Sequence, residues 1–238
     1  MIKNNHRANI NLAMLEKAAE KLGDIVDEVV FLGGCTTCLF ITDVAAPDVR
    51  PTLDVDCIVN AISLVEYYRL EERLINKGFK KSANDDVICR WHFDDLVLDV
   101  MPTDGRVLGF SNRWYKDAIK NANNHYFSND LYIKAVSAPY FLATKLEAFK
   151  LRGNKDYLSS HDLEDIIMVI DGRTELLGEL VGSCKSLQNY LSAEFLKIMS
   201  SDDFLFAMPG HLNYGALTDD RVEVVLNRIY KITSLSSL

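Results

Sequence analysis

Hydrophobic and polar positions follow two different periods along the first part of the chain. Residues 10–22 place apolar side chains every three to four positions and end at Gly23, which predicts an amphipathic helix. Short apolar runs predict strands at 26–32, 53–59, 87–93, 96–101, around Tyr126 and at 131–136. Further helices are expected at 35–41, 63–76 and 113–121. This order predicts a small mixed sheet with helices packed on it.

The period becomes helical from Ala138 onward. Pro139 suits the first turn of a helix that continues to Gly153, and a second helix is expected over 160–170. More helices are expected within 174–199 and 218–232. The sequence therefore predicts an α+β protein with a small mixed β-sheet core, followed by an α-helical C-terminal domain. The expected domains are 1–136 and 137–238.

Composition narrows the class of protein. The chain has 238 residues, of which 48% are hydrophobic and 25% charged, as in ordinary globular proteins. A net charge of −8 argues against a basic surface for long duplex nucleic acid, although local cations suffice for a short RNA end. Residues 1–11 have no signal-peptide core and no apolar run approaches a membrane span, so we expect a cytoplasmic protein without a membrane partner. Five cysteines, an odd number, favour reduced thiols.

Two aspartates stand two positions apart in the apolar run at 53–59. Side chains alternate across a strand, so Asp54 and Asp56 are expected on one face, about 7 Å apart. Neighbouring carboxylates repel each other unless a positive charge lies between them. A divalent metal ion is the usual solution.

Two further features belong with this pair. Gly33 and Gly34 follow a predicted strand and could offer backbone amides to a phosphate, or they could form a turn that needs positive φ. Asp99 interrupts an apolar strand, which is costly unless the carboxylate is paired, capped by amides or bound to metal. Together with Asp54 and Asp56, it gives three carboxylates that could hold two Mg²⁺ ions about 4 Å apart.

These features resemble a known superfamily when they are taken together. The Gly33-Gly34 pair, the string Arg-Pro-Thr-Leu-Asp-Val-Asp at 50–56, and Leu-Asp-Val at 98–100 are similar to DNA polymerase β-type nucleotidyltransferases. Within that superfamily, the likeness is to the abortive-infection-type (AbiEii-like) nucleotidyltransferase toxins of bacterial toxin–antitoxin pairs. Lys145 and Arg152, followed by Asp-Leu-Glu-Asp at 162–165, also fit this family.

The likeness covers roughly residues 26–170 and departs from the family in two places. The 19 residues between the glycines and Asp54 are more than the superfamily usually has, so 42–49 reads as an insertion. The loop at 153–161 is also long.

The resemblance implies transfer of a nucleoside monophosphate from an NTP to an acceptor hydroxyl, with release of pyrophosphate. It implies two Mg²⁺ ions, with Mn²⁺ as the alternative, held by Asp54 and Asp56, and Asp99 as third ligand or general base. It implies NTP contacts from Gly33, Gly34, Thr36, Arg50 and Lys145. Lys145 would bind the triphosphate or stabilise developing charge, and Asp165 would position Lys145 or the acceptor.

The partners implied by the resemblance are an NTP, an acceptor and an antitoxin protein. In relatives the acceptor is often the 3′ end of tRNA, and modifying it blocks aminoacylation. Other relatives modify a small drug or a protein hydroxyl. The acceptor expected here is therefore an RNA, with a small molecule or a protein as the alternatives.

The residues of 145–165 also support this assignment directly. Lys145 falls on the apolar side of its helix, between Leu142 and Leu146, so a partner for its charge is expected. Asp162 and Asp165 share a helix face. Because Ser159 and Asp162 match the spacing of a capping box, Asp162 reads as a helix-start residue and Asp165 as the better functional candidate.

Other functions remain open at this stage. An aminoglycoside-type nucleotidyltransferase would need an acidic pocket, for which the candidates are Asp85, Asp86, Asp94 and Asp95. A nucleotide-binding module without catalysis is the alternative from another class. Cys35 and Cys38 have the spacing of a thioredoxin-like site or of half a zinc site, but neither reading explains the aspartates, so a packing role is preferred.

Overall fold

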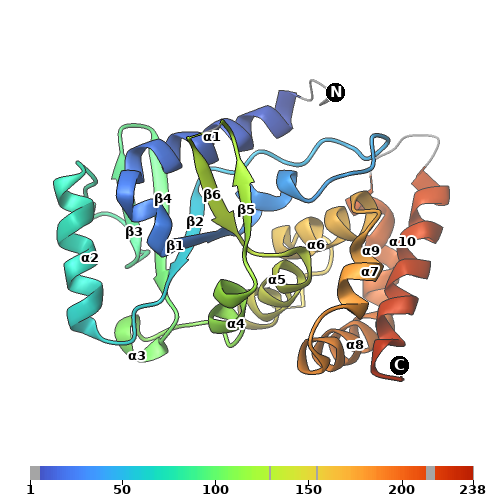
Figure 1. Ribbon diagram of the computed structural model, residues 1–238. Coiled ribbons are helices and arrows are strands. Elements are labelled where there is room, and N and C mark those ends of the chain that lie inside the picture. Colours follow the sequence, from blue (N-terminus) through green and yellow to red (C-terminus); the bar gives the residue numbers. More distant parts are fainter. Residues whose placement is uncertain (1–5, 129, 154, 213–217, 238) are drawn as a thin grey trace. The chain divides into compact units, whose positions relative to one another are not determined.

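The computed structural model describes residues 6–128, 130–153, 155–212 and 218–237 (Figure 1). These residues form a mixed sheet, several helices around it and a helical C-terminal part, which confirms the predicted α+β class.

The chain divides into two compact units that are not continuous in sequence. The sheet unit extends to Cys38 and resumes over Arg50–Ser137. The helical unit takes Leu39–Val49 and everything from Ala138 onward. The short segment between the first two strands thus belongs with the C-terminal helices.

The sheet of the described chain has six strands in the order β3-β4-β2-β1-β6-β5. Their bounds are β1 (Val29–Leu32), β2 (Val55–Val59), β3 (Arg90–Phe93), β4 (Leu96–Pro102), β5 (Asn123–Tyr126) and β6 (Tyr132–Ala135). Sequence neighbours pair antiparallel, as β1 with β2, β3 with β4, and β5 with β6. The pairs β2–β4 and β1–β6 are parallel.

The pairing register places three charged residues in one row. Arg90 lies opposite Asp99 in the β3–β4 hairpin, and Asp99 lies beside Asp56 in the parallel β2–β4 pair. Residues that pair directly across a sheet point to the same face, so these three side chains share one face. One position along, Trp91, Leu98 and Val55 form the next row, point to the other face and are buried.

Helices cover the sheet unit, and their bounds are α1 (His6–Leu22), α2 (Leu64–Asn76), α3 (Gly105–Leu108) and α4 (Tyr115–Lys120). Helix α1 contacts β2, β4 and β6 and buries Leu15, Ala18 and Leu22 (Figure 1). Helix α2 begins after Ser63, whose hydroxyl accepts a hydrogen bond from the Glu66 amide. This is a common N-cap arrangement, since it satisfies an amide that has no partner within the helix.

Several boundaries differ from the predicted ones. The strand expected from residue 26 begins at Val29, because Gly23–Glu28 form a 3₁₀ turn. The helix expected at 35–41 is a 3₁₀ helix over Gly34–Leu39. The strand expected from residue 53 begins at Val55, where its pairing with Leu98 of β4 starts. Asp54 therefore precedes β2.

Helices make up most of the helical unit. They are α5 (Ala138–Arg152), α6 (His161–Gly172), α7 (Leu176–Val181), α8 (Lys185–Met199), α9 (Asp202–His211) and α10 (Thr218–Thr233). Helix α9 was not expected, and it contains Pro209 and Gly210, which disfavour a helix. Burial of Phe204, Ala207 and Met208 outweighs that preference. Among the described residues, no helix combines the length and apolar character that a bilayer crossing requires.

The segment 39–49, of which residues 42–49 resemble an insertion by sequence, is bonded into the helical unit. The amides of Thr42 and Asp43 both donate to the carbonyl of Gly172, at 2.9 and 2.8 Å. The Thr42 hydroxyl donates to Glu175, and Asp43 pairs with Arg221 at 3.0 Å. The segment thus contacts the end of α6, the turn after it and α10.

The core of the helical unit can be tested on helix α5. Leu146 is 1% exposed, whereas Leu151 is 75% exposed on the same helix. We expect Leu146→Ala to lower the free energy of unfolding by about 2–5 kcal/mol, because it removes buried contacts and leaves a cavity. Leu151→Ala should change it by less than about 0.5 kcal/mol. Urea unfolding of both variants measures the difference, and equal effects would contradict the packing described for α5.

Candidate functional site

The guanidinium of Arg90 holds two of the three predicted metal-binding carboxylates. Its Nε and Nη2 donate to the two oxygens of Asp99, both at 2.8 Å, and Nη2 also donates to Asp54 at 2.7 Å. The hydrogen bond to Asp99 is the main reason why the pKa of Arg90 is raised above its usual value. The structure therefore brings Asp54 and Asp99 together around a cation that belongs to the chain itself.

Arg90 was not among the predicted site residues, although the sequence carries a signal for it. The predicted hairpin turns at Asp94 and Asp95, and the structure confirms that turn. A two-residue turn pairs Phe93 with Leu96, and counting back three positions pairs Arg90 with Asp99.

Gly33 leaves space for the third carboxylate. It follows Leu32, the register partner of Asp56, and has a φ of +80°. A Cβ atom on Gly33 would lie 1.9 Å from Oδ2 of Asp56 and 2.8 Å from its Cβ. The second distance involves an atom close to the backbone, so a new Asp56 rotamer would not remove the clash. Positive φ and the close approach of Asp56 both require glycine here.

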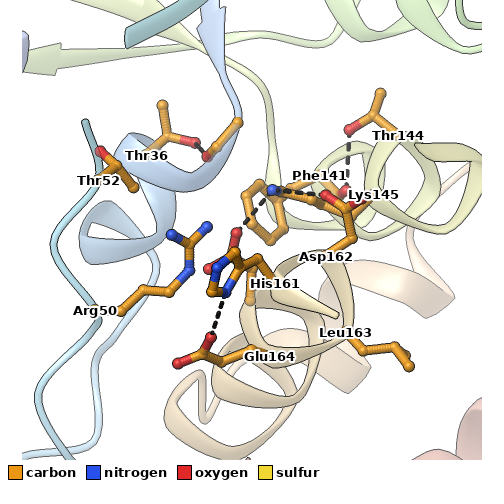
Figure 2. A network of polar contacts seen from close by, with 12 residues as sticks. Thr36, Arg50, Thr52, Phe141, Thr144, Lys145, His161, Asp162, Leu163 and Glu164 are labelled. Carbon is orange, nitrogen blue, oxygen red and sulfur yellow. Dashed lines mark hydrogen bonds and ion pairs between the residues drawn. The ribbon is translucent and has the colours of Figure 1, made fainter. Parts of the chain in front are cut away.

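The turn after Gly33 is closed by Thr36. Its amide and its hydroxyl both donate to the carbonyl of Gly33, at 3.2 and 2.8 Å (Figure 2). Gly34 and Thr36 are buried. The structure thus places both residues in the predicted glycine turn, with the Thr36 hydroxyl bonded within that turn.

Asn11 orders the string that leads to the aspartates. This residue of α1 is fully buried, and its side chain donates to the carbonyl of Arg50 at 3.0 Å and accepts from the amide of Thr52 at 3.1 Å. Sequence reasoning missed Asn11, because a single asparagine in an amphipathic helix gives no signal of a distant partner.

The helical unit contains a second charged cluster, made by Lys145 and Arg152 of α5 with Asp162 and Asp165 of α6. The ammonium of Lys145 lies 2.7 Å from Asp165 and 3.1 Å from Asp162, and all three side chains are buried. Arg152 donates two hydrogen bonds to Asp162, at 2.9 and 2.8 Å. Lys145 thus has the partners expected for it. Figure 2 shows Lys145 and Asp162 pointing toward one another.

The predicted capping role of Asp162 is wrong. The N-cap of α6 is Ser160, whose hydroxyl accepts from the Leu163 amide at 3.4 Å. The helix begins one residue later than the capping box required, so Asp162 lies in its first turn and turns inward to the two cations.

Charge compensation keeps Asp162 ionised. Burial raises the pKa of Asp162, but the hydrogen bonds from Arg152 and Lys145 and their charges outweigh it, so the pKa falls below its usual value. Two cations face two carboxylates, and the cluster is formally neutral.

The predicted residues fall into two sets, each assembled within its own unit. Asp54, Asp56, Asp99, the glycine turn and Arg50 belong to the sheet unit, whereas Lys145 and Asp165 belong to the helical unit.

The three carboxylates do not form a metal site as they stand. Their oxygens are suitable ligands for Mg²⁺. Arg90, however, takes both oxygens of Asp99 and one of Asp54. Within the residues that the structure describes, no group of three or more His, Cys, Asp and Glu side chains is arranged to hold a metal ion.

The cysteine alternative gains no support. Cys35 and Cys38 have free thiols, and burial raises the pKa of both, that of Cys38 to about 12. A reactive cysteine needs a lowered pKa, because the thiolate is the nucleophile. The Cys35 thiol instead donates to the carbonyl of Asn11 at 3.3 Å.

The aspartates that were candidates for an acidic, drug-binding pocket lie in or near the β3–β4 hairpin. Asp85 pairs with His92 at 2.6 Å, Asp95 pairs with Lys17, and Asp94 adopts a positive φ of 52° in the turn.

Comparisons with known proteins find similarity among solved structures. No family model matches the chain, and no curated protein matches it by sequence. Among solved structures, JHP933 from Helicobacter pylori is similar with a TM-score of 0.48 and 12% identity, over 97% of this chain and 92% of that one. An H. pylori protein described as a candidate nucleotidyltransferase has a TM-score of 0.46 and 11% identity, over 100% of this chain and 96% of that one.

Substitution of two glycines with positive φ can distinguish the cost of backbone strain from the cost of a clash with Asp56. Gly33 and Gly109 have φ values of +80° and +82°, but a Cβ on Gly109 would meet nothing within 4 Å. We expect Gly109→Ala to cost about 1 kcal/mol of stability. Gly33→Ala should cost at least about 2 kcal/mol more, because the added Cβ overlaps Asp56. Urea unfolding compares the two variants, and equal losses would contradict the close approach.

The charged cluster of α5 and α6 should make stability depend on pH. Because its pKa is lowered in the folded protein, Asp162 stabilises the fold above its usual pKa of 3.8, and this contribution disappears as the pH falls through the folded-state value. Asp162→Asn should therefore cost roughly 2 kcal/mol near neutral pH and less below about pH 3.5. Urea unfolding across this pH range measures the difference in stability between wild type and Asp162→Asn.

A matched control for this prediction is Glu164→Gln on the same helix. Glu164 pairs with His161 at 3.1 Å, and this pair is more exposed than the pair of Lys145 with Asp162. It should change stability by less than about 0.5 kcal/mol. A gap between wild type and Asp162→Asn that stays constant with pH would count against the ionised cluster.

Proposed function

We propose that this protein is a nucleotidyltransferase that moves a nucleoside monophosphate from an NTP to an acceptor hydroxyl. The observation that carries the proposal is the pairing of Asp56 and Asp99 on adjacent parallel strands, with the Gly33 turn against Asp56. Two carboxylates side by side, next to a turn that contains a glycine with positive φ, suit the binding of cations and phosphates.

The proposed reaction is an in-line displacement at the α-phosphorus of the NTP. The acceptor oxygen forms a bond to that phosphorus, the bond to the bridging oxygen of the β-phosphate breaks, and pyrophosphate leaves. The hydroxyl proton passes to a carboxylate, for which Asp99 is the proposed base. The proposed cofactor is Mg²⁺, replaceable by Mn²⁺, with Asp54, Asp56 and Asp99 as ligands; it would neutralise the charge of the phosphates.

The remaining residues have proposed roles in NTP binding. Gly33, Gly34, Thr36 and Arg50 are proposed to contact the nucleotide. Lys145 is proposed as a cation for the triphosphate, and Asp165, 2.7 Å from its ammonium, as its positioning residue.

The acceptor and the biological role rest on the sequence resemblance alone. We propose an RNA acceptor, namely the 3′ end of tRNA, and a toxin-like function in the cytoplasm with an antitoxin protein as partner. A net charge of −8 is compatible with binding a short RNA end through a few local cations.

A second candidate function is a nucleotide-binding module without turnover. The specific observation in its favour is the Arg90 guanidinium, which engages Asp54 and Asp99 where a catalytic metal ion would need them.

Nucleotidyl transfer can be tested with the full chain, MgCl₂, total tRNA and each of the four NTPs labelled at the α-phosphate. We expect label on RNA with at least one NTP. Asp56→Asn should lower the rate at least about a hundredfold, because it removes one of the paired carboxylates while keeping the side-chain size.

The control variant is Asp95→Asn. Asp95 lies in the hairpin turn, and its carboxylate pairs with Lys17 of α1. It should transfer label at the wild-type rate. If none of the four NTPs labels RNA, protein or small hydroxyl acceptors, the transferase proposal fails. Calorimetric NTP binding in that case would favour the nucleotide-binding module.

A further inference from the structure

We propose that Arg90 is an internal competitor of the divalent metal ion: it neutralises Asp54 and Asp99 in the metal-free protein and must release them before the ion binds. The use of that ion in catalysis rests on the proposed function. The competition itself rests on the contacts of Arg90.

The contacts of Arg90 have the geometry of a dedicated ion pair. Nε and Nη2 form a two-pronged fork on Asp99, and Nη2 is shared with Asp54, with all three distances between 2.7 and 2.8 Å. Such forks are among the strongest hydrogen-bonded ion pairs, because the planar guanidinium matches a carboxylate. The register of the hairpin places Arg90 directly opposite Asp99, so the pairing follows from the backbone.

The local charge explains why a cation is required. Asp54, Asp56 and Asp99 contribute three negative charges, and the side chain of Asp99 is only 9% exposed. A carboxylate as poorly hydrated as that of Asp99 is costly without a compensating charge. Arg90 supplies a positive charge that Asp54 and Asp99 share.

The same contacts obstruct the ion. A Mg²⁺ ion binds a carboxylate oxygen at about 2.1 Å and tolerates little distortion of its octahedral geometry. Arg90 donates to both oxygens of Asp99 and to Oδ2 of Asp54, so the region between these two carboxylates holds a guanidinium. An ion placed there would meet both steric overlap and repulsion between like charges.

Arg90 is placed where it can leave. It lies on β3, the edge strand of the sheet, and its side chain is 24% exposed. Rotation of the side chain into water would leave the backbone pairing with β4 intact. The guanidinium would regain hydration when it moves out, whereas the carboxylates would gain the ion.

The competition can be measured without any nucleotide. Titration of the full-length protein with MnCl₂, followed by the electron paramagnetic resonance signal of free Mn²⁺, gives the dissociation constant directly. We expect Arg90→Gln to bind Mn²⁺ at least about tenfold more tightly than wild type, which corresponds to about 1.4 kcal/mol. Arg90→Lys, which keeps the charge but loses the fork, should lie between them.

The matched control is Arg106→Gln. Arg106 forms the same kind of fork on Asp104, at 3.0 and 2.7 Å, outside the candidate site. It should leave Mn²⁺ binding unchanged. If Arg90→Gln unfolds without metal, Arg90→Lys keeps the test valid, and Mn²⁺ should raise the melting temperature of Arg90→Lys more than that of wild type.

The outcomes separate this inference from the proposed function. If Arg90→Gln and Arg90→Lys bind Mn²⁺ no more tightly than wild type while wild type transfers nucleotides, Arg90 is not a competitor and the transferase proposal stands. If Mn²⁺ binds neither wild type nor the variants, the inference is overturned, and metal dependence fails with it. Tighter binding in the variants supports the inference even if no acceptor is found.

Discussion

The parallel pairing of β2 with β4 is the constraint on which the site depends. It fixes Asp56 beside Asp99 on one face of the sheet, so two like charges lie on adjacent strands. Two features of the neighbouring strands accommodate that pair. Gly33, after β1, leaves room for the carboxylate of Asp56, and Arg90, on β3, compensates Asp99 together with Asp54. The next row on the opposite face of the sheet, Trp91, Leu98 and Val55, is apolar and buried.

The two charged clusters of the molecule solve the same electrostatic problem in different ways. Lys145 and Arg152 match Asp162 and Asp165 in number, so that cluster is formally neutral. Lys145 and the two carboxylates are buried, whereas the Arg152 side chain is 71% exposed. The carboxylates of the sheet unit instead have one guanidinium, that of Arg90, shared between Asp54 and Asp99. A balanced cluster suits a structural or positioning role, whereas an unbalanced one attracts cations from solution. This contrast is the physical reason for placing the proposed chemistry at the aspartates of the sheet unit.

Local sequence patterns predicted the elements, but distant contacts decided the details of the site. The α+β class, the β3–β4 turn and a partner for Lys145 follow from periodicity, a two-residue loop and a charge on an apolar face. The same turn could have identified Arg90. The parallel register of β2 and β4 was not predictable, since its two strands are far apart in sequence and no local rule sets their alignment. The role of Asp162 was missed because the helix starts one residue later than the capping pattern indicated.

The interleaved order of the two units has a consequence for how this architecture can be divided or recombined. The chain leaves the sheet unit after Cys38, pairs Asp43 with Arg221 of α10, and returns at Arg50. A break at the junction of Ser137 and Ala138 would yield an N-terminal piece with the whole sheet unit plus segment 39–49, and a C-terminal piece that lacks this segment of its own unit. The C-terminal piece would lack Thr42 and Asp43, whose backbone amides donate to the carbonyl of Gly172. Exchange of the helical part between related proteins would therefore need segment 39–49 to be exchanged along with it.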